Sequence, residues 1–325
     1  MSKDIQPQLA NVTALRQRAC LSLTLFLLLS VAMLCVLPIC DAADLDEGMP
    51  TQFRTGFMKN IFSNTDPRDA SAVLEMHSRE IARHLGLDIT ASVSMFSDID
   101  TMIDAIRKSR LELVAMPSLD YLHNRKRVTL FPSFVGSNIA SQGIHFVVIT
   151  RKDSGIRSFS DLKGKTLLLP AFSIYEPSHL WLEVLLMKTG NEGRDTFFAK
   201  VNELPKISKA IMGVFFRQAD AAIVTRASLD TSRQLNPQLE TQLVVLAESP
   251  NLCDIVVCML PNTSKKFRRD LNKAMITLSN SASGRQMYTI FQSGGMSVFK
   301  QEYMDGLEEL VNEHARLLAK KSKRN

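Results

Sequence analysis

The sequence feature that most constrains the fold is a pair of short apolar runs separated by a charged, glycine-containing segment. Residues 146–149 read FVVI and residues 166–169 read TLLL, with Gly155 and a short amphipathic stretch at residues 159–162 between them. Runs of four or five residues rich in Val, Ile and Leu, bounded by polar glycine turns, are typical of buried strands. The arrangement therefore predicts the start of a lobe built from strands and helices.

Predicted strands alternate with predicted helices over most of the chain. Predicted strands lie at residues 51–57, 89–95, 111–116, 131–135, 145–149, 166–169, 221–224, 243–246 and 255–260. Predicted helices lie at residues 70–85, 99–106, 118–122, 178–190 and 207–216, with Asp69 capping the first and Ser178 beginning the fourth. The segment from residue 264 to about residue 321 is predicted to be mostly helical, with a break at Gly294 and Gly295. This pattern favours an α/β fold, and 325 residues suffice for two lobes of roughly 100 to 150 residues each.

Residues 1–43 form a separate leader. Arg16 and Arg18 precede an apolar run at residues 21–37, and small residues follow up to Ala42. This order is typical of a secretory signal peptide cleaved after Ala42. The run approaches the roughly 20 residues that a membrane helix needs, so an uncleaved N-terminal anchor is the alternative. Both interpretations place the chain from residue 44 onward outside the cytoplasm, in the periplasm.

Charge and cysteine content narrow the possible partners. The formal net charge is +6, and the leader and the tail at residues 320–324 carry much of the basic excess. A nucleic-acid-binding surface would carry basic residues on a folded face, with aromatic residues between them, so nucleic acid is not an expected partner. Only Cys253 and Cys258 lie beyond the leader. They are interpreted as core residues, with a disulfide left open, and we expect no metal or cofactor.

Five segments taken together resemble one family. They read SMFSDIDTMIDAI, LELVAMPSLDYL, HFVVITRKDSGIRSFSDLKGKTLLLP, QADAAIVT and LAESPNL, in that order along the chain. The combination resembles the PhnD-like family of extracytoplasmic solute-binding proteins, which serve ABC importers for phosphonate, phosphite or phosphate-type anions. The resemblance covers roughly residues 51–297, and RKDSGI with the following SDLKGK is its most specific part.

The resemblance implies a type II periplasmic-binding-protein fold. Such a fold has two α/β lobes with mixed, mostly parallel sheets, joined by crossing strands that form a hinge beside an interlobe cleft. Lobe 1 would comprise residues 44–145 and 251–300, lobe 2 residues 146–250, and a C-terminal helix with a basic tail residues 301–325. The implied function is capture of a small anion for an inner-membrane ABC permease by a monomer that is not an enzyme.

The expected site lies where strands end and helices begin, because helix N-termini and nearby hydroxyls bind phosphate-like oxygens. The candidate ligand-binding residues are Ser97, Ser118, Tyr121, Ser173, Ser178, His179 and Thr225. Each serine could instead be a plain helix cap, with Asp98 as the competing cap beside Ser97. Tyr121 could be packing at the cleft edge. Arg226 could pair with an anion, although a surface salt bridge is the favoured interpretation.

One loop departs from the family pattern. The family carries S-T-S-G there, whereas residues 173–180 read SIYEPSHL, so Glu176 and Pro177 interrupt the hydroxyl-bearing run. A carboxylate beside an anion site repels the anion. An aminophosphonate-like ligand, or another small anion or zwitterion, would therefore fit Glu176 better than phosphonate itself.

Two other classes of function remain as alternatives. A sensory protein that presents its ligand-bound form to a membrane kinase would have the same sequence pattern, and a small-molecule enzyme could use the same fold. The sequence contains no G-x-S-x-G, H-E-x-x-H, Walker A or G-x-G-x-x-G motif, which argues against the enzyme. Among the scattered histidines, His77 recurs on an apolar helix face and is interpreted as a hydrogen-bonded interior residue.

Overall fold

The computed structural model describes residues 50–62, 66–86, 90–137, 143–171, 175–191, 193–290 and 294–323. The chain divides into two compact units, Met1–Glu47 and Gly48–Asn325, and all described residues belong to the second. The predicted leader and Ser173 lie outside the described residues. Among the described helices, none is long and apolar enough to cross a membrane.

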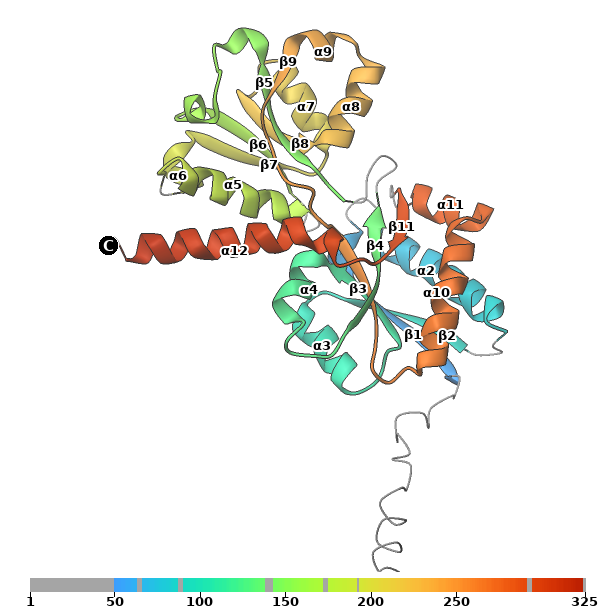
Figure 1. The fold of residues 1–325 in the computed structure, drawn as a ribbon. Helices are drawn as coiled ribbons and strands as arrows, with labels where there is room; N and C mark the ends of the chain where they lie inside the picture. The colour runs from blue at the N-terminus through green and yellow to red at the C-terminus, as the bar shows by residue number, and fades with distance from the viewer. Residues whose placement is uncertain are drawn as a thin grey trace, which may run out of the picture. The chain divides into compact units, whose positions relative to one another are not determined.

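The first of two sheets has six strands in the order β11-β4-β10-β3-β1-β2 (Figure 1). Its strands are β1 (Gln52–Met58), β2 (Thr90–Phe96), β3 (Leu113–Pro117), β4 (Phe131–Ser137), β10 (Ile255–Met259) and β11 (Gly295–Val298). Strand β1 pairs in parallel with β2 and β3, whereas β10 runs antiparallel to β3 and β4, and β11 antiparallel to β4. Its helices are η1 (Lys59–Ile61), α2 (Pro67–His84), α3 (Ile99–Arg107), α4 (Ser118–Asn124), α10 (Lys265–Ser279) and α11 (Ala282–Ile290).

The second sheet has five strands in the order β7-β6-β8-β5-β9. Its strands are β5 (Phe146–Arg151), β6 (Thr166–Pro170), β7 (Lys200–Leu204), β8 (Ala221–Thr225) and β9 (Leu243–Glu248). Strand β6 is parallel to β7 and β8, and β5 is antiparallel to β8 and β9. Its helices are η2 (Lys152–Ser154), η3 (Phe159–Leu162), α5 (Glu176–Lys188), α6 (Arg194–Phe197), α7 (Ile207–Phe215), α8 (Arg226–Leu235) and α9 (Gln238–Gln242). We call the six-stranded and five-stranded halves the first and second lobes.

Two segments connect the lobes, one between β4 and β5 and one between β9 and β10. They are hydrogen-bonded to each other, because the Ile144 amide donates to the Leu252 carbonyl (2.7 Å) and the Leu252 amide donates to the Ile144 carbonyl (2.9 Å). Because the chain leaves and returns side by side, β5 and β10 enter their sheets antiparallel to neighbouring strands. The α/β fold with two mixed sheets that the sequence predicts is confirmed.

The strands that are wholly buried are those with continuous apolar sequences. All five residues of β3 and all five of β8 are buried, as are the first five of β5. Strands covered on both faces by helices show this pattern, whereas β2, with the sequence TASVSMF, carries a mixed pattern of burial. Cys253 and Cys258 are both free and buried, which confirms their interpretation as core residues.

Two local predictions are wrong. The N-cap of α2 is Asp66 rather than Asp69, because Pro67 occupies the first helical turn and the Asp66 side chain accepts from the Arg68 amide (2.8 Å). Helix α5 begins at Glu176, so Ser178 lies within its first turn rather than at its start. The predicted interruption of the helical segment at Gly294 and Gly295 is confirmed, and residues 295–298 form the edge strand β11, paired with β4, which was not predicted.

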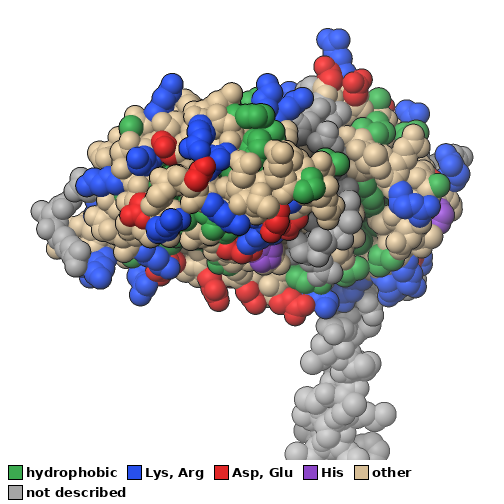
Figure 2. Space-filling view, turned by 90° about the horizontal axis from the view of Figure 1, so that it is seen from above, with side chains coloured by type: hydrophobic (Ala, Val, Ile, Leu, Met, Phe, Trp, Pro, Cys, Tyr) green, Lys and Arg blue, Asp and Glu red, His purple; other side chains and the backbone are tan. Residues whose placement is uncertain are grey.

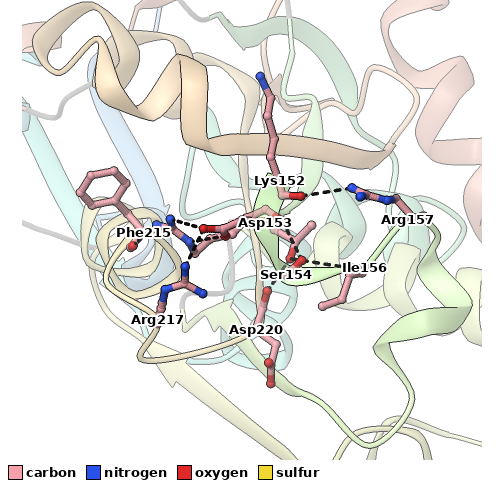
Figure 3. Close-up of polar contacts among 10 residues, drawn as sticks. Lys152, Asp153, Ser154, Ile156, Arg157, Phe215, Arg217 and Asp220 are labelled. Atoms are coloured by element: carbon pink, nitrogen blue, oxygen red, sulfur yellow. Dashed lines mark hydrogen bonds and ion pairs between the residues drawn. The ribbon is translucent and has the colours of Figure 1, made fainter.

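The family-specific segment after β5 fastens the strand to helix α7 (Figure 3). The Arg151 guanidinium donates to both oxygens of Asp153 (2.8 and 2.9 Å) and to the Phe215 carbonyl (2.5 Å). Arg217 donates to the same carboxylate (2.5 Å). The Arg151 guanidinium lowers the pKa of Asp153 to about 2. The RKDSG motif at residues 151–155 therefore forms a turn whose side chains join β5 to α7 in the second lobe.

Helix α12 (Glu302–Ser322) follows β11 and contacts both lobes. Arg125, which follows α4, donates to Glu308 (2.6 Å). On the second lobe, His314 Nε2 lies 2.7 Å from Glu183 Oε2 of α5, and Lys188 pairs with Glu313 at 3.5 Å. On the face seen in Figure 2, Lys and Arg side chains are interspersed with Asp and Glu.

A buried ion pair supports the first sheet. Glu112 is 3% exposed, and its carboxylate accepts from the Arg54 amide (2.6 Å) and from the Arg54 guanidinium (2.5 Å). The Glu112 amide in turn donates to the Arg54 carbonyl (2.8 Å). One carboxylate thus satisfies both a backbone and a side-chain donor at the start of β1.

We predict that Glu112→Ala lowers the free energy of unfolding by about 1 to 3 kcal/mol, because the Arg54 amide loses its acceptor and the partly exposed guanidinium keeps only its bond to the Ser109 carbonyl (2.8 Å). Urea denaturation would measure the loss. The matched control is Asp104→Ala, which removes the exposed pair with Lys108 (2.5 Å) and should change stability far less. Equal losses in the two variants would contradict the prediction.

Candidate functional site

The predicted ligand residues lie in loops that follow strands and begin helices. Ser97 lies between β2 and α3, Ser118 begins α4 after β3, and Thr225 ends β8 before α8. Ser178 and His179 lie in the first turn of α5, after β6. The rule that places ligand-binding residues at the carboxyl ends of parallel strands therefore selected residues that do lie where a strand ends and a helix begins, in both lobes.

In the first lobe, the three candidates have different environments. Ser118 is fully buried, with its hydroxyl donating to the Cys253 carbonyl (2.5 Å) and its amide donating to the Asp254 carbonyl (2.9 Å). Tyr121 is 7% exposed, and burial raises the pKa of its hydroxyl. Ser97 is exposed and accepts from Lys59 Nζ (2.9 Å), while Asp98 rather than Ser97 caps α3.

In the second lobe, the candidate side chains are also bonded internally. Ser178 is fully buried and its hydroxyl donates to the Tyr175 carbonyl (2.7 Å). His179 Nε2 lies 2.9 Å from the Pro170 carbonyl oxygen. The Thr225 hydroxyl accepts from the Ser228 amide (3.1 Å) and so caps α8. Arg226 donates to Glu248 (3.2 Å), which confirms the salt-bridge interpretation.

The starts of α4 and α5 carry side chains that interact across the two lobes. Burial raises the pKa of Asp120, and the charge of Glu176 raises it further. Burial likewise raises the pKa of Tyr175, with the charge of Asp254 as the second cause. Because such electrostatic effects need proximity, Asp120 and Asp254 of the first lobe lie close to the N-terminus of α5. We call Asp120, Tyr175, Glu176 and Asp254 the acidic corner.

Asp254 is the most perturbed carboxyl of the acidic corner. Burial raises its pKa from 3.8 to about 6, although the Ile255 amide donates to Oδ1 (2.7 Å) and opposes that shift. Gly136 of β4 leaves the space that this carboxyl fills, since a Cβ atom there would lie 2.5 Å from Asp254 Oδ1. The carboxyl therefore has a fitted position directly after the second segment that connects the lobes.

The acidic corner is suited to binding a positively charged or hydrogen-bond-donating group. It offers three carboxyl groups and a tyrosine hydroxyl, and no ion pair to any of the three carboxyls is found among the described residues. Within the part of the chain that the structure describes, no cluster of His, Cys, Asp and Glu could hold a metal ion.

Sequence reasoning missed Lys59, Tyr175 and Asp254. Lys59 directly follows β1, so the strand-end rule that selected Ser97 could have selected it too. Tyr175 precedes α5 by one residue and could have been found in the same way. Asp254 had no such signal, because it precedes β10 and joins the site only through the pairing of the two connecting segments.

The two mixed sheets joined by two connecting segments define a two-lobe periplasmic binding protein. Over residues 61–303 the chain matches the family described as ABC transporter, phosphonate, periplasmic substrate-binding protein, and it belongs to that family. A search of curated proteins finds no match.

Solved structures share the fold at low sequence identity. A Xanthomonas citri protein bound to ATP is 15% identical with a TM-score of 0.60, over 83% of this chain and 99% of that chain. PhnD1 from Prochlorococcus marinus, in complex with methylphosphonate, is 16% identical with a TM-score of 0.55, over 82% and 98%. A binding-protein component of an ABC phosphonate transporter from Pseudomonas aeruginosa is 12% identical with a TM-score of 0.54, over 83% and 88%.

We predict that Asp254→Asn stabilises the ligand-free protein at neutral pH. A folded-state pKa of about 6, against 3.8 when unfolded, means that the folded protein loses stability as pH rises between these values. Removing the charge should recover on the order of 2 to 3 kcal/mol at pH 7.5 and nothing near pH 4. Urea unfolding at both pH values would measure this.

Asp153→Asn is a control for which the expected change in stability has the opposite sign. Its pKa is lowered to about 2, so the ionised carboxylate stabilises the folded protein above the unfolded pKa. The variant should therefore be less stable than the parent protein at pH 7.5. Loss of stability in Asp254→Asn at pH 7.5 would contradict the raised pKa of Asp254.

Proposed function

We propose that this protein captures a small oxyanion of the phosphonate, phosphite or phosphate type between its lobes and delivers it to an ABC permease in the inner membrane. Membership of the phosphonate-binding family supports this role, which requires binding and no chemical conversion. We further propose that it works as an exported monomer without a cofactor.

The acidic corner is the observation that carries the choice of ligand. Asp120, Glu176 and Asp254 would repel a ligand that is only negative, and two of these carboxyls already have raised pKa values. A positively charged group on the ligand would remove that repulsion and form charge-assisted hydrogen bonds. We therefore propose that the ligand joins its oxyanion to an amino group, as an aminoalkylphosphonate does.

The hydroxyl groups of the site support the same choice. Ser118 and Ser178 each use their single donor hydrogen on a backbone carbonyl. What remains on each hydroxyl is acceptor capacity, which suits an ammonium group and not an oxyanion. We propose that Lys59, with Ser97, supplies the charge for the oxyanion. Tyr121, Ser173, His179 and Thr225 remain proposed contacts.

We predict that an aminoalkylphosphonate raises the melting temperature of the purified protein more than an alkylphosphonate of the same length or inorganic phosphate. A ligand that binds only the folded state stabilises it by RT ln(1 + [L]/Kd), so at equal concentration the tighter ligand stabilises more. Glu176→Gln should lower the affinity for the aminoalkylphosphonate by about tenfold, because a charge-assisted hydrogen bond is lost. It should not lower the affinity for the alkylphosphonate. Isothermal titration calorimetry would measure both affinities.

Glu183→Gln is the matched control on the same helix, because Glu183 faces His314 of α12. It should leave both affinities unchanged. If no phosphonate, phosphite, phosphate, sulfonate or carboxylate shifts the melting temperature, the proposed function is wrong. If alkylphosphonate binds as tightly as its amino analogue, the function stands and the acidic corner has a different role.

We also predict that Ser118→Ala combined with Ser178→Ala weakens binding of the same ligand by about tenfold, because the starts of α4 and α5 lose the hydroxyls that hold their backbones. Ser208→Ala, an exposed serine of α7, is the control and should have no effect. Unchanged affinity in the double variant would remove both serines from the site.

A further inference from the structure

The first lobe contains an apolar cavity of about 120 Å³, and Gly136 and Ile255 of its lining also border Asp254 of the acidic corner. Strands β1, β3 and β10 contribute to one side, and helices α2, α10 and α11 to the other. Phe53, Leu74, Ile81, Leu113, Met275 and Met287 line its interior, and each of these is buried. Phe57, Phe62 and Met296 also line it and are only partly buried, so they mark where the cavity approaches the surface.

His77 of α2 is the polar side chain that distinguishes this cavity. It is 8% exposed and lines the cavity wall. The sequence predicts a hydrogen-bonded interior histidine; the interior position is confirmed, but neither ring nitrogen has a hydrogen bond among the residues that the structure describes. Burial lowers the pKa of His77, with the charge of Glu80 opposing the shift. The neutral ring has one donor and one acceptor nitrogen.

The other polar groups of the lining already have partners. The Thr55 hydroxyl lies 3.4 Å from the Ser78 hydroxyl and donates to the Ser92 carbonyl at 3.2 Å. The Tyr288 hydroxyl lies 2.7 Å from the Ser279 hydroxyl. Water held in a cavity needs two to four polar partners, so His77 alone would hold it poorly. Among the described residues that line the cavity, none is a Lys or Arg that could attract an oxyanion.

We propose that this cavity is a second binding site, which takes a small neutral molecule with an aromatic or compact hydrocarbon body and one hydroxyl group bonded to His77. The volume agrees with this class, because an engineered apolar cavity of about 150 Å³ binds benzene. An occupant restores the dispersion contacts that the lining lacks when empty, and its hydroxyl satisfies the histidine. The proposal concerns a ligand other than the oxyanion and does not rest on the proposed oxyanion site.

The test compares phenol with toluene, which have the same ring and differ in the hydroxyl. The full chain is labelled with ¹³C at its methionine methyl groups and titrated with each probe by NMR. Phenol should shift the signals of Met275, Met287 and Met296, which line the cavity. It should bind at least fivefold more tightly than toluene. Absence of any shift at these three methionines with either probe would overturn the proposal.

Substitution of the histidine tests its role. His77→Phe should bind phenol and toluene equally, while His84→Phe, an exposed position on the same helix, should keep the preference for phenol. His77→Met is a more flexible replacement and should give the same loss of preference if the phenylalanine variant does not fold. A preference for phenol that survives removal of His77 would overturn the proposed hydrogen bond. Phosphonate binding should be unchanged in all three variants.

Discussion

The structure depends on two backbone hydrogen bonds between Ile144 and Leu252, which hold the segments connecting the lobes against each other. Phe146 and Ser249 continue the pairing, with the Phe146 amide donating to the Ser249 hydroxyl and the Ser249 amide donating to the Phe146 carbonyl, both at 2.8 Å. Because the two segments run in opposite directions, each sheet acquires antiparallel strands among parallel ones. The mixed topology is thus a direct result of joining the lobes in this way.

The same pairing positions the candidate site. Cys253 and Asp254 follow Leu252 immediately, so their carbonyl groups come to lie against the hydroxyl and amide of Ser118. The buried carboxyl of Asp254 then fills the space beside Gly136. A segment that connects the lobes therefore also supplies the site with its most perturbed group, and any change in the pairing would move that carboxyl.

Much of the fold could be predicted from the sequence, because buried strands carry a strong signal. Continuous apolar runs in the sequence predicted β3, β5 and β8, which are strands buried on both faces. Strand β7 was not predicted, since its sequence KVNEL has only two apolar side chains, Val201 and Leu204, and both are only partly buried. The strand-end rule selected loops that do lie between strands and helices, yet the direction of each hydroxyl depends on backbone carbonyls from distant segments. The pairing of Asp254 with Ser118 spans more than a hundred residues of sequence, and no local pattern encodes it. The most family-specific motif, around Asp153, fastens β5 to α7.

Helix α12 has a mechanical consequence for a protein of two lobes. Its buried residues Met304, Leu307 and Leu310 anchor it in the core, while its ion pairs reach Arg125 beside α4 and Lys188 on α5. If one lobe rotates about the paired connecting segments, the separation of α4 and α5 changes, and we expect one of these sets of ion pairs to open. Salt screens such exposed pairs, so a higher ionic strength would weaken this restraint on rotation of the lobes.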